Sequence, residues 1–287
     1  MNRKMIRDGM EILPLLAFIN LTKYLSLESR SALCGWLISW VVRINFKIKR
    51  RIIQNLDLTM PNKTKSEKKQ FLRRLGQFVG ITFAELIFNS EFQKNINQFN
   101  YSSSDLEPLL EAKNEGRPII IVSAHIGPWE AIRAILKLHN LTAGAIYKKN
   151  KNQFYETLHL KAIKCGGEPI FPTGLSGTKS MVKYLQTGGI VAVMLDQAAM
   201  DGEFFDFLGV RAKTSTSIAK IALKLNALVV PSYAIRSEKN QTINIYFEKP
   251  IRHTTYKEMT RTLTKSIEKR VMCNPEQWYW LHRRWKY

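Results

Sequence analysis

Cysteine is scarce in this chain of 287 residues. Its three cysteines, Cys34, Cys165 and Cys273, lie far apart and are odd in number. This spacing excludes a disulfide framework and the paired ligands of a zinc site. We therefore expect reduced thiols, and we expect neither a metal nor another bound cofactor.

Acidic residues are also few. The chain has 23 Asp and Glu against 44 Lys and Arg, which gives a formal net charge of +21. Such an excess indicates an anionic partner: a nucleic acid, an anionic membrane or an acidic protein. No helix-turn-helix, zinc-finger or ribonucleoprotein-type motif supports nucleic acid. Because basic residues border apolar stretches, as Arg43 to Arg51 do, we expect an anionic membrane surface and no nucleic acid.

Long apolar runs are missing near the start of the chain. The uncharged stretches at residues 12–22 and 31–42 each fall short of the roughly 20 residues that a spanning helix needs. No small-residue cleavage site follows the first, so we expect no cleavable signal peptide. Trp36 and Trp40 recur at helical spacing, and basic residues flank both stretches. The pattern favours an in-plane or shallow hairpin anchor at residues 1–45, with a single span or ordinary core helices as alternatives.

The rest of the chain, residues 46–287, alternates short apolar runs with amphipathic helical runs. Strands are expected at residues 119–124, 142–147, 169–171, 190–195, 228–235 and 243–247. Helices are expected at residues 66–92, 106–114, 128–138, 152–165, 176–186, 216–225 and 256–271. This alternation predicts an α/β fold with a mainly parallel central sheet and helices on both faces.

One candidate site stands at the end of the first strong apolar run. His125 follows that run, Gly127 allows a sharp turn, Pro128 suits a first helical position, and Glu130 falls in the first helical turn. An imidazole and a carboxylate thus meet at a helix N-terminus. That arrangement is typical of a general base that activates a hydroxyl for attack on an acyl carbon. A helix cap and a packed histidine are the alternative interpretation.

The segment from His125 to Glu130, read as His-x-Gly-x-Trp-Glu, resembles the bacterial lipid A biosynthesis (lauroyl/myristoyl) acyltransferase family. That family lies within the larger group of glycerolipid acyltransferases that carry His-x4-Asp/Glu. Further segments in the family's order extend the resemblance from about residue 50 onward. They are Asn55-Leu56…Pro61, Ala145-Ile146-Tyr147-Lys148…Asn152, Gly189 to Asp196-Gln197, Gly202…Phe207-Leu208-Gly209…Thr214, and Pro275-Glu276-Gln277-Trp278-x-Trp280-x-His282-Arg283-Arg284-Trp285-Lys286.

The resemblance implies a membrane-associated O-acyltransferase whose catalytic domain spans residues 46–287. It would move a fatty acyl chain from a thioester of acyl carrier protein or coenzyme A, as co-substrate, to a hydroxyl of a lipid A precursor. His125 would take the hydroxyl proton, and Glu130 would accept from the other imidazole nitrogen. The expected partners are an acidic acyl carrier protein, a lipid acceptor and the cytoplasmic face of a bacterial inner membrane.

Four further residues are candidate substrate contacts. Lys148 would neutralise an acceptor phosphate if its strand neighbours the His125 strand, or it is a solvated lysine. Asp196 closes another strand and would hold a substrate hydroxyl or a basic neighbour, or cap a turn. Arg283 and Arg284, which alternate with tryptophans, are expected to brace the site and face phosphate.

The chain also departs from the family it resembles. Ile126 and Pro128 stand where the family commonly has Phe and Asn, and Lys148 stands where it usually has Arg. Lysine lacks the planar fork that binds phosphate at two points. Two alternatives therefore stay open: an acyltransferase for another lysolipid or glycolipid, and a catalytically silent, basic membrane-binding relative.

Overall fold

The computed structural model describes residues 3–237 and 242–286. Within these residues, seven strands form one sheet in the order β1-β9-β8-β2-β5-β3-β4. Every neighbouring pair is parallel except β8 with β9. The mainly parallel sheet predicted from the sequence is therefore confirmed. The strands are β1 (Phe99–Asn100), β2 (Ile119–Ser123), β3 (Gly144–Tyr147), β4 (Ile170–Pro172), β5 (Ile190–Met194), β8 (Leu228–Arg236) and β9 (Ile243–Phe247).

Helices cover both faces of this sheet, as the alternating pattern predicts. They are α1 (Arg3–Thr22), α2 (Leu27–Ile44), α3 (Phe46–Thr59), α4 (Lys65–Ile87), α5 (Asn89–Phe92), α6 (Glu107–Asn114), α7 (Glu130–Leu138), α8 (Gln153–Cys165), α9 (Leu175–Gln186), α10 (Ser217–Leu225) and α11 (Tyr256–Cys273). All residues of β2 are buried. Ile119 and Ile121 join a core with α6 and α7, whereas Ile120 and Val122 join one with α3, α4, α9, α10 and α11. Residues that alternate along a strand face opposite sides, so β2 sits between two cores.

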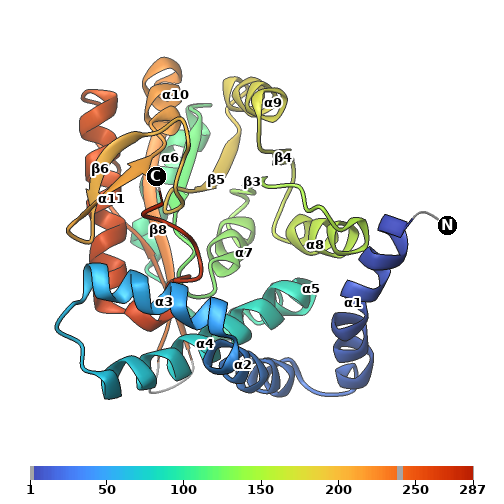
Figure 1. Cartoon of the computed structure of the whole chain (residues 1–287). Coiled ribbons are helices and arrows are strands. Elements are labelled where there is room, and N and C mark those ends of the chain that lie inside the picture. The colour runs from blue at the N-terminus through green and yellow to red at the C-terminus, as the bar shows by residue number, and fades with distance from the viewer. Residues whose placement is uncertain (1–2, 238–241, 287) are drawn as a thin grey trace.

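The helices α2, α3 and α4 lie together across one end of the sheet (Figure 1). α2 and α4 pack closely because α4 presents glycine at two crossing points. A Cβ at Gly76 would lie 2.5 Å from Ser39 Cα, and one at Gly80 would lie 2.5 Å from the Cys34 carbonyl oxygen. α2 is therefore part of the folded body, although residues 1–45 stood apart in the sequence-based division.

Exposed apolar side chains concentrate on the first two helices. Trp36 and Trp40 are about half exposed and touch edge to face, and Arg43 lies over the Trp40 ring. Large hydrophobic side chains exposed on α1 and α2 include Met10, Leu13, Leu21, Leu33, Leu37, Val41 and Ile44. Across residues 3–237 and 242–286, no helix combines the length and the apolar character needed to cross a bilayer.

Several elements differ from the sequence-based expectation. Residues 202–214, to which no strand or helix was assigned, contain an antiparallel hairpin, β6 (Glu203–Phe207) and β7 (Val210–Thr214). The helix expected at residues 66–92 is divided into α4 and α5. The basic segment after residue 45 is the helix α3, capped by Asn45. A capping box between Thr64 and Glu67 starts α4 at Lys65, one residue before the expected start.

Candidate active site

His125 and Asp196 meet because two strand ends are aligned. Ser123 of β2 pairs with Met194 of β5, and the two strands are parallel neighbours. Each side chain comes two residues after its strand end, so both project at the carboxyl edge of the sheet. Ligand sites of open α/β sheets gather at this edge.

Asp196 is a buried acceptor for the histidine. Its Oδ1 lies 2.8 Å from His125 Nδ1. Its Oδ2 accepts from the His125 backbone N–H at 3.0 Å and from Trp278 Nε1 at 2.8 Å. Of the three roles considered for Asp196, holding a basic neighbour is the one that the geometry supports. With Nδ1 occupied, the nitrogen left for a substrate is Nε2 of His125.

The charges of this pair reinforce each other. Burial alone would raise the pKa of Asp196, but the His125 charge and the hydrogen bonds from His125 and Trp278 outweigh it and hold that pKa below its usual value. Burial alone would lower the pKa of His125, but the Asp196 charge and hydrogen bond hold it above the ordinary 6.5. An ionised Asp196 thus keeps the Nδ1 proton in place, which leaves Nε2 with its lone pair.

The turn after His125 requires glycine. Gly127 has φ +54°, and a Cβ there would lie 2.2 Å from the Ala234 carbonyl oxygen. Its N–H donates to the Gln277 carbonyl oxygen at 3.0 Å. The tight turn noted in the sequence is therefore confirmed, and it is fixed from outside by a distant part of the chain. The Gly127, Trp129 and Ala131 N–H groups all donate to backbone carbonyls, so each is occupied within the protein.

The segment after η3 (Pro275–Gln277) braces the histidine from the other side. Tyr279 N–H donates to the His125 carbonyl oxygen at 2.9 Å, and the two rings lie 6.4 Å apart. Asn55 of α3 holds this segment through Trp280 O and His282 O at 2.9 and 3.1 Å. The buried indoles of Trp278, Trp280 and Trp285 pack against one another. This cluster gives the tryptophans of the last segment a structural role.

Glu130 does not bond to His125, contrary to the expected catalytic pairing. It begins α7, and its carboxylate turns toward Arg133 one helical turn ahead, with 3.0 Å between Oε2 and Nη1. Asn89 Nδ2 donates to the same oxygen at 3.2 Å. Arg133 also donates to backbone carbonyls of residues 143, 163 and 167. Glu130 and Arg133 together thus tie α7 to α5 and α8 in this structure.

The two arginines of the last segment have separate environments. Arg284 is 1% exposed and donates to Thr214 Oγ1 and to the Lys213 carbonyl oxygen, so it braces the β6–β7 hairpin. Burial leaves it no surface for a ligand, which corrects the expected phosphate contact. Arg283 is exposed, and its contact with a substrate stays a prediction.

Lys148 lies at the same edge of the sheet but not beside His125. It follows β3, and β5 separates β3 from β2. Its loop is held by Glu156, which accepts from the Tyr147 hydroxyl and the Asn150 N–H, both at 2.9 Å. Lys148 itself is exposed. The adjacency on which its predicted role depended is therefore absent, and a phosphate contact would need an acceptor that spans β5.

Three residues in or next to the segments around His125 had no individual role in the sequence-based prediction. Trp129 meets the imidazole edge to face at 5.3 Å. Arg51 donates to the Leu281 carbonyl oxygen at 3.1 Å, and its charge acts on Tyr279 and His282. Burial lowers the pKa of His282, which also senses the charges of Asp196 and His125. Arg51 was visible only as one of several basic residues, because the fold alone brings α3 to this segment.

Comparison with known proteins places the chain in a family. Residues 12–287 match the family of bacterial lipid A biosynthesis acyltransferases, and the chain belongs to that family. The protein is therefore an acyltransferase of the lipid A biosynthesis family.

Individual relatives are distant but are covered over most of their length. The chain is 23% identical to Lipid A biosynthesis acyltransferase 2 of Shigella flexneri over 84% of this chain and 79% of the relative. It is 22% identical to a lipid A biosynthesis acyltransferase of Haemophilus influenzae over 92% of this chain and 84% of the relative. The resemblance seen in the sequence is thereby confirmed.

Proposed function

We propose that this protein transfers a fatty acyl chain from an acyl thioester to a hydroxyl of a lipid A precursor. The donor would be a thioester of acyl carrier protein or coenzyme A. The observation that carries the proposal is the His125–Asp196 pair at the carboxyl edge of the sheet, which occupies Nδ1 of a quarter-exposed imidazole and leaves Nε2 for the substrate. This pair takes the place of the His125–Glu130 pair in the expected mechanism.

The proposed reaction is direct transfer. Nε2 of His125 removes the proton of the acceptor hydroxyl while its oxygen bonds to the thioester carbonyl carbon. The tetrahedral intermediate then collapses, the carbon–sulfur bond breaks, and the proton on Nε2 passes to the leaving sulfur. The products are an ester and a free thiol, and the imidazole returns to its starting state. Asp196 stabilises the imidazolium between these two steps.

The location we propose is the cytoplasmic face of a bacterial inner membrane. The exposed apolar residues of α1 and α2 suit an anchor that lies in the plane of the interface. Lys47, Lys49 and Arg50 are exposed on the neighbouring α3. Positive charge beside an apolar surface favours anionic lipid, and the same charge favours an acidic carrier protein.

Lipid analysis tests the proposed function directly. Mass spectrometry would compare lipid A from cells that lack the gene with cells that express wild type, His125→Ala or His139→Ala, a control at a distant histidine. We expect lipid A to lack one acyl chain in cells without the gene and in cells that express His125→Ala. Wild type and His139→Ala should restore that chain. Purified enzyme supplied with each thioester would then identify the donor. Unchanged lipid A with a changed lysolipid or glycolipid would move the acceptor to that second class.

A further inference from the structure

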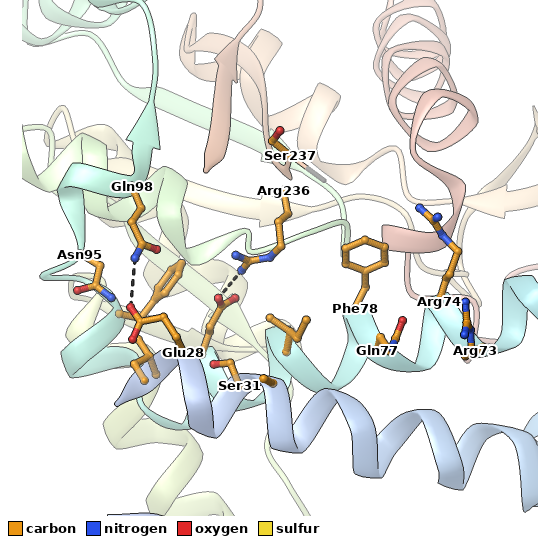
Figure 2. A pocket seen from close by; sticks show the side chains of 15 residues that line it. Glu28, Ser31, Arg73, Arg74, Gln77, Phe78, Asn95, Gln98, Arg236 and Ser237 are labelled. Atoms are coloured by element: carbon orange, nitrogen blue, oxygen red, sulfur yellow. Dashed lines mark hydrogen bonds and ion pairs between the residues drawn. The ribbon is translucent and has the colours of Figure 1, made fainter. Parts of the chain in front are cut away.

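Several arginines with little exposed surface pair with a carboxylate in this protein. Arg236, for example, meets Glu85 in the wall of a cavity beside α2 and α4 (Figure 2). Arg51 of α3 is also partly buried, but in the part of the chain that the structure describes no carboxylate lies within ion-pair distance of it. Burial of a charge is costly unless the charge is paired. Arg51 is therefore a candidate for binding an anionic ligand.

The guanidinium of Arg51 lies beside the last segment and keeps donors for a ligand. Its Nη1 donates to the Leu281 carbonyl oxygen at 3.1 Å. Asn55, one turn further along α3, donates to the carbonyl oxygens of Trp280 and His282 at 2.9 and 3.1 Å, so it holds the segment on both sides of Leu281. The other nitrogens of Arg51 have no partner among the described residues, and none of them is buried. A ligand can therefore reach them.

Two residues connect Arg51 with His125. The Tyr279 N–H donates to the His125 carbonyl oxygen, and the Tyr279 ring lies 6.4 Å from the imidazole. Burial raises the pKa of the Tyr279 hydroxyl, and the positive charge of Arg51 opposes that rise. Burial lowers the pKa of His282, and the charges of His125 and Arg51 lower it further. The imidazole and the guanidinium thus have two neighbours in common, so one substrate can contact both.

A guanidinium at this position suits a phosphate. Its planar fork donates to two phosphate oxygens at once, and it stays charged at every pH at which the enzyme would work. Lys148, the cation expected to meet phosphate, lacks this fork and lies across β5 from the His125 strand. Both substrates of the proposed reaction offer a phosphate: the lipid acceptor carries one, and the carrier thiol stands at the end of a phosphate-bearing pantetheine arm.

We propose that Arg51 binds a phosphate group of the substrate whose acyl transfer takes place at His125. The identity of that substrate rests on the proposed function, whereas the phosphate contact rests on the position and the unpaired charge of Arg51. No bond forms or breaks at Arg51, so its effect falls on binding. It is the cation that sets a preference for phosphorylated over unphosphorylated substrates.

Steady-state kinetics of the purified full chain tests this assignment. Arg51→Gln should raise the KM of the phosphate-bearing substrate about 10- to 100-fold, the loss expected for a hydrogen bond to a charged group, with kcat little changed. Arg51→Lys should lose less, because it keeps the charge without the fork. Arg117→Gln is the matched control and should behave like wild type. Arg117 is a partly buried arginine that donates to the Asn226 carbonyl oxygen, before β2 and at the end of that strand away from His125.

Substrates without phosphate distinguish binding from bracing. Wild type should prefer the phosphorylated substrate, and Arg51→Gln should lose most of that preference. If Arg51 serves only to hold the Leu281 carbonyl, Arg51→Gln disturbs His125 through the last segment. It would then lower kcat equally for phosphorylated and unphosphorylated substrates and would lower the melting temperature. That result would overturn the proposal.

Two comparisons identify which substrate supplies the phosphate. Acceptors with and without phosphate form one pair, and acyl thioesters of phosphopantetheine and pantetheine form the other. Loss of the first preference in Arg51→Gln assigns the contact to the acceptor, and loss of the second assigns it to the donor. A variant that keeps both preferences would show that Arg51 binds neither phosphate.

A binding measurement keeps this proposal separate from the proposed function. Calorimetric titration of phosphopantetheine and of the phosphorylated lipid acceptor, each alone and in detergent, needs no acyl transfer. At least one of them should bind about tenfold more weakly to Arg51→Gln than to wild type and to Arg117→Gln. Equal affinity of both ligands for all three proteins would overturn the assignment of Arg51 and leave the proposed acyl transfer standing. Absence of transfer by wild type, with the affinity difference present, would overturn the proposed function alone.

Discussion

Glu130 and Arg133 form an ion pair one turn apart on α7, and both side chains are almost completely buried. Gly166 packs against the pair so closely that a Cβ there would lie 2.5 Å from Glu130 Oε2. Breaking a buried pair by removing one charge costs about 3–5 kcal/mol, because the other charge stays buried. We therefore predict that Glu130→Gln lowers the melting temperature, measured by calorimetry.

The same variant separates a structural role from a catalytic one. The acid limb of its kcat/KM profile should match wild type, because Glu130 does not bond to His125. Glu111→Gln, an exposed change on α6, is the control for loss of a carboxylate. A normal melting temperature with a hundredfold loss of kcat would instead give Glu130 the catalytic role suggested by its spacing.

Asp196→Asn should lower kcat about 10²–10⁴-fold, because a neutral amide neither fixes the Nδ1 proton nor stabilises the imidazolium. Steady-state kinetics of the purified enzyme measures this. His125→Ala should lose a similar amount, and the double variant should be no worse than either single one, since the two residues act as a unit. Additive losses would show that Asp196 and His125 act separately.

Activity should depend on the protonation of His125. Its pKa lies above 6.5 in the folded protein. As pH falls through this pKa, the imidazole becomes protonated and can no longer act as the base. We predict an acid limb of kcat/KM above pH 6.5, and a shift of this limb to lower pH in Asp196→Asn, where the raising charge is gone. A limb at the same pH in both proteins would show that another group controls it.

The raised pKa of His125 also makes the stability of the folded protein depend on pH. Its contribution is fully present below the unfolded pKa and is lost as pH rises through the folded pKa. The lowered pKa of Asp196 acts oppositely, with a contribution that is lost as pH falls through the folded value. Denaturant titrations across pH 5–9, roughly the range in which histidines titrate, measure the free energy of unfolding at each pH. The dependence of this free energy on pH should therefore differ between wild type and His125→Ala.

Lys148 tests whether the acceptor reaches beyond β5. If it contacts an acceptor phosphate, Lys148→Ala should mainly raise the acceptor KM, and Lys148→Arg should restore or improve binding through its planar fork. Assays with acceptors that carry or lack that phosphate measure the effect, and Lys149→Ala is the neighbouring control. An equal preference for the phosphorylated acceptor in wild type and Lys148→Ala would identify Lys148 as a solvated lysine.

Membrane association is best tested on the surface of α2. Deleting residues 1–45 would also strip α4 of its partner at Gly76 and Gly80. The double variant Trp36→Ser, Trp40→Ser instead removes two indoles that are each about half exposed. It should weaken liposome binding and leave the melting temperature close to that of wild type. Residual binding should need anionic lipid and fall with salt. Unchanged flotation with liposomes would exclude this face as the anchor.

Much of the fold could be predicted because strands and helices alternate with clear periodicity. All of β2 is apolar except its last residue, and the sequence therefore indicated a strand buried on both faces. The hairpin β6–β7 was missed because its residues mix charged and aromatic side chains without a long apolar run. The helix α3 was missed because its basic residues were interpreted only as a charge cluster.

The sequence indicated most residues of the site, but it did not indicate correctly which of them contact one another. His125 and Asp196 each stood at a strand end, but their contact depends on β5 lying beside β2, which no local pattern encodes. Glu130 was paired with His125 from its spacing and from the family resemblance, and neither fixes the direction of a side chain across a turn. The burial of Arg284 likewise depends on where a distant hairpin packs.

The bracing of His125 by residues 275–285 has a consequence for how the protein matures. A nascent chain that has reached residue 270 already contains every described strand of the sheet. It still lacks the Tyr279 N–H that holds the histidine carbonyl and the indole of Trp278 that orients Asp196. The strands of the sheet therefore do not complete the site by themselves. Residues 275–285 must also pack against the ends of β2 and β5 before His125 and Asp196 are held in place.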